Sequence, residues 1–271
     1  MIELKPGDLA RAYSLCKALP FIPLRSTLLG NTPGRVFTDE QKVPQVVIVW
    51  TQWGFTYLTG QPMHEQLIAD IVNRLIPELI SESSLRTQEL LLFPCSQSWT
   101  SNLSSSLAAY RPKKIYRRAF SFNPNSFSDH YGWLDRLPSG FHIYRIDQPL
   151  IERLGSPVSQ EITNTWASTQ DFLERGFGFC LLHKDEIVSL CLSSFIAGRE
   201  VEACIRTSLQ YRSKGYATFT ALAFIEHCLQ NDLQPHWECP WDHIASCALA
   251  TRLGFVNPVD HLVYHLPAPA R

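Results

Sequence analysis

The feature of this sequence that most constrains its fold is an order of predicted elements that occurs twice. Each half contains three extended runs in succession, a helix, a further extended run, a second helix and a closing extended run. Extended runs that follow one another across short turns are typical of a meander of strands. The repeated order therefore predicts an α/β chain built of two similar halves.

The predicted elements follow from alternation, helical spacing and turn residues. In the first half they are the runs RVFTD, QVVIVWTQ and FTYLTG, a helix over 63–80, the run ELLLFP, a helix over 98–110 and the run KIYRRAFSF. In the second half, an extended run FHIYRI, a short helix DQPLIERLG and a helix over 159–176 come first. The runs FGFCLLHK, EIVSLCLSSF and REVEACIRT follow, and then a helix over 217–231, the run HWEC, a helix over 243–253 and the closing run HLVYHL.

Residues 123–140 are rich in turn formers and separate the two halves. We therefore expect a first half at 1–125, a linker at 126–140 and a second half at 141–271. A weak local likeness between FPCSQSWTSNLSSSLAAYRP and WECPWDHIASCALATRLGF agrees with a duplication, although the element order is the stronger argument.

The charge balance does not indicate a partner class. The formal net charge is −1 with 18% charged residues, so neither a basic nucleic-acid surface nor an acidic tail is predicted.

No uninterrupted apolar run is long enough to cross a bilayer, and Glu3, Lys5 and Asp8 interrupt any signal-peptide apolar region. Eight scattered cysteines without a C-x-x-C pair favour reduced thiols. A cytoplasmic location is expected, and the oligomeric state stays open.

A short polar loop precedes the predicted helix of the second half, in the stretch YRSKGYATF at 211–219. The first turn of a helix leaves N–H groups unpaired and carries partial positive charge, so it attracts anions. Gly215 and Ala217 leave the backbone bare, and Arg212 and Lys214 add charge. The loop matches neither of the two common nucleotide-binding glycine patterns. It predicts a diphosphate cradle, with an ordinary solvated helix start as the alternative.

The pattern R-x-x-G-x-A at 212–217, followed by L-A-x-R-L-G-F at 249–255, resembles the GNAT N-acetyltransferase superfamily. More narrowly, the chain is similar to the subfamily that includes the zwittermicin A resistance acetyltransferase. The segments that carry this likeness are PGRVFTD, FTYLTG, GFGFCLL, IRTSLQYRSKGYA and W-x-C at 237–239. The resemblance implies two GNAT-like halves, each a mixed, mainly antiparallel sheet flanked by helices.

The resemblance also implies a site for acetyl-CoA as co-substrate in the second half. Two neighbouring strands splay apart there, and backbone groups of one strand hold the pantetheine arm. The residues implied to contact the cofactor are Ile205, Arg206, Thr207, Arg212, Ser213, Lys214, Gly215, Tyr216, Ala217 and Ser246. The corresponding junction of the first half, YLTGQPMHEQ, lacks the loop. The first half is therefore expected to be a degenerate, structural copy.

Acetyl transfer to an amine requires a base, because a protonated amine cannot attack. Glu202 is the candidate base, since it is acidic in an otherwise apolar strand where burial can raise its pKa. Strand alternation places it on one face with Cys204 and Arg206, unless a bulge exchanges the faces. A strand-edge pairing of Glu202 with Arg206 is an equal alternative.

The family often carries a tyrosine acid at a position where this chain has Ala250, which leaves water, Ser246 or Cys247 as substitutes. A zinc site made by His236, Cys239, His243 and Cys247 is disfavoured, because residues three apart on an extended run point to opposite faces. No metal is expected.

We therefore predict an acetyl-CoA-dependent N-acetyltransferase whose acceptor is a primary amine of a small molecule, such as an aminated natural product or antibiotic. Protein or peptide N-acetylation is the alternative within the same class. A catalytically silent acyl-CoA-binding protein is the alternative from another class, and a purely structural protein is a weaker third one.

Overall fold

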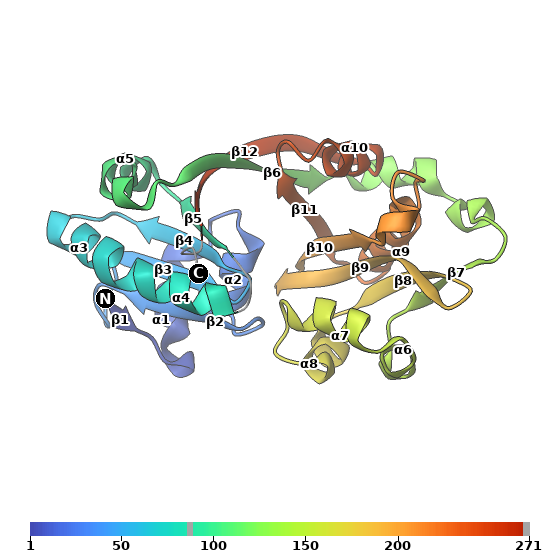
Figure 1. Cartoon of the computed structure of the whole chain (residues 1–271), viewed down its shortest axis with the longest axis horizontal. Helices are drawn as coiled ribbons and strands as arrows, with labels where there is room; N and C mark the ends of the chain where they lie inside the picture. Colours follow the sequence, from blue (N-terminus) through green and yellow to red (C-terminus); the bar gives the residue numbers. More distant parts are fainter. Residues whose placement is uncertain (86–88, 268–271) are drawn as a thin grey trace. The chain divides into compact units, whose positions relative to one another are not determined.

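The computed structural model describes residues 1–85 and 89–267, which fold as two compact units (Figure 1). Unit 1 comprises Met1–Arg117 together with the C-terminal segment from His261, and unit 2 comprises Arg118–Asp260. In each unit, helices pack against both faces of a mixed sheet, which confirms the predicted fold class. Within the described ranges, no helix combines the length and apolar character needed to span a bilayer.

Unit 1 is a meander with one parallel strand pair. Its strands are β1 (Ile2–Glu3), β2 (Gly34–Thr38), β3 (Val46–Thr51), β4 (Phe55–Gly60) and β5 (Leu90–Pro94). Its helical segments are η1 (Pro6–Asp8), α1 (Leu9–Cys16), α2 (Ile22–Leu28), α3 (Glu65–Asp70), the π-helical turn η2 (Ile71–Leu75), α4 (Ile76–Leu85), α5 (Gln97–Ser106) and η3 (Ala108–Tyr110). Strands β1 to β4 are antiparallel to their neighbours, whereas β4 and β5 run parallel.

Unit 2 repeats this plan. Its elements are β6 (Lys113–Phe122), η4 (Pro124–His130), η5 (Trp133–Arg136), β7 (Phe141–Arg145), α6 (Gln148–Leu154), α7 (Ser156–Thr163), α8 (Thr169–Arg175), β8 (Gly178–His183), β9 (Glu186–Ala197), β10 (Glu200–Thr207), η6 (Leu209–Tyr211), α9 (Ala217–Gln230), β11 (Gln234–Pro240), α10 (Ile244–Arg252) and β12 (Phe255–Leu266). Strands β7 to β10 are antiparallel to their neighbours, and β10 and β11 run parallel.

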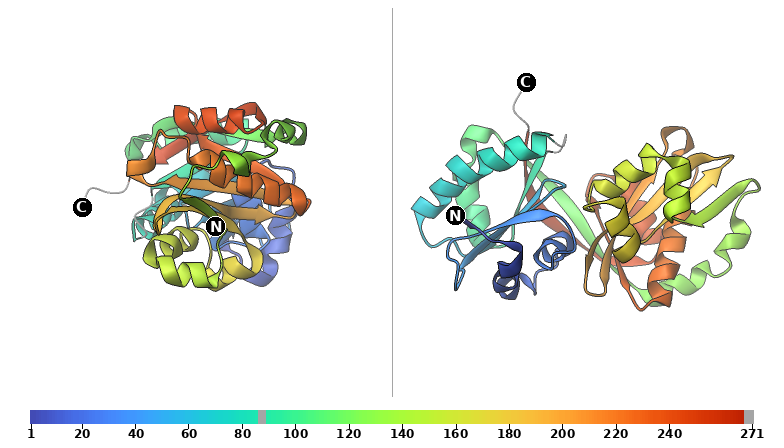
Figure 2. Two further views of the ribbon diagram at one scale, coloured as in Figure 1. Left: turned by 90° about the vertical axis from the view of Figure 1, so that its right-hand side faces the viewer. Right: turned by 90° about the horizontal axis from the view of Figure 1, so that it is seen from below.

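The core of unit 2 has two layers, one on each face of its sheet (Figures 1 and 2). Helices α6 to α8 pack on one face around Phe172 and Leu190. Helix α9 packs on the other face around Phe224, Val201 and Trp237. Because side chains alternate between the faces of a strand, each residue of β10 belongs to one layer or the other.

The closing strands are exchanged between the repeats. β6 begins in unit 1 and ends in unit 2, while β12 begins in unit 2 and ends in unit 1. In the sheet order β12 lies beside β5 and β6 lies beside β11, and Tyr264–Leu266 pair antiparallel with Leu90–Leu92. The fifth strand of each unit, β5 in unit 1 and β11 in unit 2, thus pairs on its outer edge with a strand from the other repeat, which protects that edge.

The unit boundaries therefore differ from the predicted halves, because the element order along the chain does not reveal an exchange of closing strands. The predicted linker at 126–140 contains most of η4 and all of η5 and belongs to unit 2. Its Phe127 and Trp133 are buried in the α9 layer, so turn-forming composition here reflects short helical turns.

Two predicted helices are interrupted. The helix expected over 159–176 is divided into α7 and α8, because Trp166 donates a hydrogen bond from Nε1 to Ser193 O (2.8 Å) and Ser168 caps α8 by accepting from the Asp171 N–H. The helix expected over 63–80 contains a π-helical turn at Ile71–Leu75 and continues to Leu85.

Candidate active site

Strands β10 and β11 separate after a short paired stretch. They pair in parallel over Glu200–Glu202 and Gln234–His236, and beyond this the described part of the chain shows no pairing between them. β10 nevertheless continues to Thr207 along β9. The Ser208 N–H donates to Val188 O on the β9 side, so by alternation the main-chain groups of Ile205 and Thr207 point toward the open side. We call this opening the strand fork.

The loop after β10 leads directly into the start of α9. Its N-cap residue, Tyr216, makes no side-chain hydrogen bond to the first turn. Ser213 and Gly215 have left-handed backbone conformations, with φ of +60° and +79°. A Cβ added at Gly215 would meet nothing within 4 Å. The backbone of this loop, which we call the cradle (Arg212–Ala217), is therefore open in front of a helix N-terminus that favours anions.

Side chains fix the cradle in place. Arg212 donates from Nε to Thr207 O (3.1 Å) and ties the loop to the end of β10. The ring of Tyr216 stacks on Phe141, with centroids 4.7 Å apart. Lys214 lies over the Tyr211 ring, with Nζ 5.8 Å from the centroid. The two basic side chains of the cradle are exposed, so their charges are available to a ligand.

Tyr211 anchors the short turn η6 just before the cradle. Its hydroxyl donates to Glu186 Oε2 over 2.7 Å, and Gln210 donates to the same oxygen over 2.9 Å. The hydrogen bond to Glu186, followed by burial, raises the pKa of Tyr211. The turn is thereby tied to the β8–β9 hairpin.

Glu202 lies at the point where the strand fork begins, opposite His236, and is 7% exposed. A bulge does occur here, but the extra residue is Ser194 on β9, so alternation along β10 is unbroken. Ala203 and Ile205 accordingly pack in the α9 layer. Glu202 therefore shares the opposite face with Cys204 and Arg206, as the alternation predicted.

Arg206 points toward helix α7. Its Nε lies 3.3 Å from Glu161 Oε2, and about half of its side chain is exposed. The contact with Glu161 was not foreseen from the sequence, which offered only Glu202 as a partner for Arg206.

The last helix contributes a polar and an apolar position. Ser246 accepts a hydrogen bond from Trp237 Nε1 over 3.1 Å, and Ala250 is completely buried in the α9 layer. The hydroxyl of Ser246 is thus held by β11. Ala250 has no group that could protonate a leaving thiolate, at the position where the family often carries a tyrosine.

The four residues considered for a metal do not form a site. His236 Nε2 lies 3.2 Å from Glu200 Oε1 at the start of the strand fork. Cys239 and Cys247 approach each other at the junction of β11 and α10. Among the described residues, no group of three or more His, Cys, Asp or Glu side chains is arranged to hold a metal ion.

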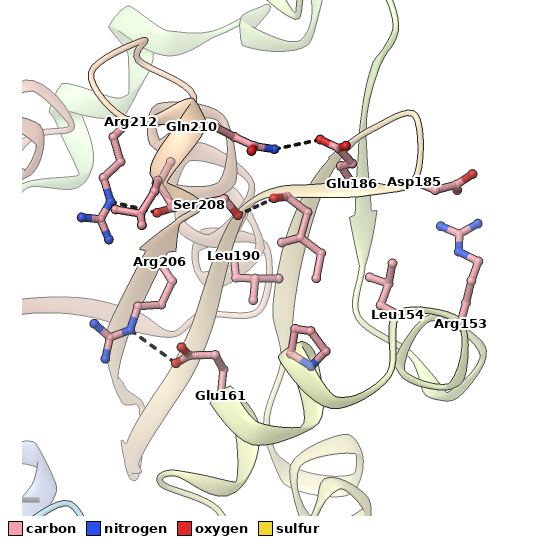
Figure 3. A pocket seen from close by; sticks show the side chains of 14 residues that line it. Arg153, Leu154, Glu161, Asp185, Glu186, Leu190, Arg206, Ser208, Gln210 and Arg212 are labelled. Carbon is pink, nitrogen blue, oxygen red and sulfur yellow. Dashed lines mark hydrogen bonds and ion pairs between the residues drawn. The ribbon is translucent and has the colours of Figure 1, made fainter. Parts of the chain in front are cut away.

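A pocket of about 610 Å³ opens beside the cradle (Figure 3). It is lined by α6, α7, the β8–β9 turn, the end of β10 and η6, and it shares Arg206, Thr207 and Arg212 with the predicted cofactor residues. Its other charged side chains are Arg153, Glu161, Asp185 and Glu186. Sequence reasoning missed these four. The two adjacent acidic residues Asp185 and Glu186 could have been noticed in the sequence. No spacing rule places Arg153 of α6 and Glu161 of α7 beside them.

Comparisons with known proteins agree with this architecture. The sequence model of a family described as GNAT acetyltransferase matches residues 23–264. The chain is similar to the uncharacterized N-acetyltransferase YdfB of Bacillus subtilis (strain 168), at 31% identity over 240 residues, covering 89% of this chain and 88% of the relative.

Solved structures also share the fold. The GCN5-related N-acetyltransferase-like protein from Streptococcus suis 89/1591 superposes with a TM-score of 0.71 at 24% identity, covering 95% of this chain and 98% of that protein. A tandem GNAT protein from the clavulanic acid biosynthesis pathway gives 0.55 at 12% identity, covering 97% and 96%. The second likeness agrees with two GNAT-like halves in one chain.

Proposed function

The chain belongs to the GNAT acetyltransferase family, whose enzymes use acetyl-CoA as co-substrate, and from this premise we propose that unit 2 transfers acetyl to a primary amine of a small molecule. Unit 1 then serves as a degenerate, structural copy. A likeness to the zwittermicin A resistance subfamily favours an aminated natural product or antibiotic as acceptor.

The observation that carries this proposal is the strand fork next to the cradle. Beside β11, the strand fork offers the main-chain N–H and C=O of Ile205 and the N–H of Thr207 to the amide groups of a pantetheine arm, while Thr207 O accepts from Arg212. The uncapped start of α9, with Arg212 and Lys214 beside it, suits a diphosphate. The residues present therefore fit acetyl-CoA, and Ser246, already held by Trp237, would border the same groove.

The pocket supports a small acceptor over a protein substrate. A volume of about 610 Å³ is in the range of small-molecule sites, and Glu161, Asp185 and Glu186 can hold ammonium groups. In this scheme Glu202 is the base that removes the proton of the attacking amine.

A calorimetric titration of acetyl-CoA tests the donor site, comparing the wild type with Gly215→Glu. We expect micromolar binding of one acetyl-CoA per chain and at least a hundredfold loss in the variant, because a carboxylate would stand in the cradle. Gly198→Glu is the matched control: Gly198 also has a positive φ (+65°), lies exposed in unit 2, and a Cβ there also meets nothing within 4 Å. Absence of binding to the wild type would refute the proposal.

Release of free thiol from acetyl-CoA with a panel of small amines then tests transfer. The rival function, a catalytically silent acyl-CoA-binding protein, is favoured by one observation: the position of the usual acid is an alanine buried in the core. Binding without thiol release for any small amine or peptide would support this rival.

A further inference from the structure

Two cysteines at the junction of β11 and α10 lie within reach of each other. The Sγ atoms of Cys239 and Cys247 are 3.6 Å apart, and both residues are thiols in this structure. Cys239 is buried at the end of β11 (4% exposed), whereas Cys247 on α10 is partly exposed. The proposed function gives no role to the pair.

Arg118 interacts electrostatically with both cysteines. Arg118 is held by Asp260 through two hydrogen bonds of 2.7 and 2.8 Å. The pKa of Arg118 is raised first by this carboxylate, and electrostatic interaction with Cys247 and Cys239 adds to the effect. The thiolate is the reactive form of a cysteine in oxidation and exchange.

We propose that Cys239 and Cys247 are a modification site that forms a reversible intramolecular disulfide. The oxidant is a peroxide. The thiolate of Cys247, the more exposed residue, attacks one peroxide oxygen and the O–O bond breaks, which gives a sulfenic acid and one water after protonation. The thiolate of Cys239 then attacks that sulfur, the S–O bond breaks, and a second water leaves. Two electrons pass from the two thiols to the peroxide, and a small dithiol reverses the reaction.

Oxidation changes the wall of the strand fork. The Sγ atoms must close from 3.6 Å to about 2.05 Å, which draws the first turn of α10 toward β11. Ser246, next to Cys247, is hydrogen-bonded to Trp237 on β11, the strand that lies beside β10 and separates from it after His236. The disulfide is therefore expected to lower turnover, and this part of the inference rests on the proposed function.

Unit 1 contains a comparison pair that is expected to stay reduced. Burial raises the pKa of Cys16 to about 11, and the Cys16 thiol contacts the Thr59 hydroxyl. The pKa of Cys95 is also raised, first by burial and then by the nearby Cys16. Both pKa shifts favour the protonated thiol, so a mild oxidant should leave Cys16 and Cys95 reduced.

The chemical part is tested on the full chain with stoichiometric hydrogen peroxide, alkylation of remaining thiols and peptide mass spectrometry. We expect a Cys239–Cys247 cross-linked peptide that dithiothreitol removes, with Cys16 and Cys95 fully alkylated. If peroxide oxidises other cysteines while this pair stays alkylated, the site does not exist. This readout needs no enzymatic activity, so it stands even if the acetyltransferase assay fails.

The functional part compares turnover before and after oxidation in the wild type, Cys247→Ser and Cys239→Ser. We expect at least a tenfold, dithiothreitol-reversible loss in the wild type and no oxidation-dependent loss in either variant. Cys247→Ala provides a second variant if serine at the partly buried position impairs folding. A cross-link with unchanged turnover would overturn the regulatory role, and equal loss in the wild type and the variants would assign the effect to another residue.

Discussion

The two units share one strand order but differ where their parallel strands meet. In unit 1, β4 and β5 pair over Phe55–Leu58, and the Cys95 N–H continues the pairing by donating to Leu58 O (2.9 Å). The next two carbonyls of β4 are also occupied: Thr59 O accepts from Trp99 Nε1 (3.1 Å) and Gly60 O accepts from Ser96 Oγ (3.4 Å). In unit 2, the described residues pair β10 with β11 over Glu200–Glu202 alone; β10 continues to Thr207 along β9, and Thr207 O accepts from Arg212 Nε (3.1 Å).

Helices α3 and α9, which follow β4 and β10, also differ in how well their N-termini suit an anion. α3 begins at Glu65, whose carboxylate complements the positive end of the helix and repels a phosphate. α9 begins at Ala217 behind Arg212 and Lys214. Both units have a meander, a crossover helix and a parallel fifth strand, so these elements suffice for the fold. The strand fork next to a helix start that suits an anion is found in unit 2, and we expect the site to need both.

The largest effect that would sharpen this comparison is expected from Glu202→Gln. If Glu202 is the base at the strand fork, turnover with a small amine should fall by about a hundredfold or more at neutral pH, while the affinity for acetyl-CoA stays unchanged. Raising the pH should recover part of the loss, because the amine then deprotonates without help. Steady-state kinetics across pH 6–9, with calorimetry alongside, measures both quantities.

Glu200→Gln is the control, since Glu200 lies two residues earlier on the same face of β10. It should retain turnover within a factor of about three, as expected of a residue outside the chemistry. Normal turnover of Glu202→Gln at neutral pH would remove Glu202 from the mechanism.

Local patterns indicated an open loop before a helix at Arg212–Ala217, because its glycine and basic residues lie within one short segment, and the binding of a diphosphate there stays a prediction. The strand fork could not be predicted in this way, since it depends on where β10 and β11 stop pairing, which is a matter of register between segments some thirty residues apart. The bulge is instructive as well: a sequence shows that a bulge is possible, but only pairing shows that Ser194 on β9 absorbs it.

A moderate effect is expected from Lys214→Ala in the cradle. Charge-assisted contacts of an exposed lysine to a phosphate are worth about 1.5 kcal/mol, so the affinity for acetyl-CoA should fall about tenfold, with a weaker dependence on salt. Calorimetry at two salt concentrations measures this. Glu65→Lys places a lysine at the corresponding helix start of unit 1. It should create no second binding site, because the carbonyls at the end of β4 already accept hydrogen bonds. Binding of two acetyl-CoA molecules by Glu65→Lys would break the comparison.

The smallest effect on the donor site is expected from Trp99→Phe. Trp99 is completely buried among the side chains that α3 to α5 pack onto the sheet of unit 1, and its indole N–H satisfies Thr59 O. Phenylalanine keeps most of the apolar contact but leaves that carbonyl unpaired, so chemical denaturation should show a loss of about 2 kcal/mol in stability. Affinity for acetyl-CoA should be unchanged at a temperature where the variant is folded, because the cradle and the strand fork belong to unit 2. A variant that is equally stable but binds acetyl-CoA more weakly would mean that the closed edge of unit 1 contributes to the donor site, and the description of unit 1 as a structural copy would then be wrong.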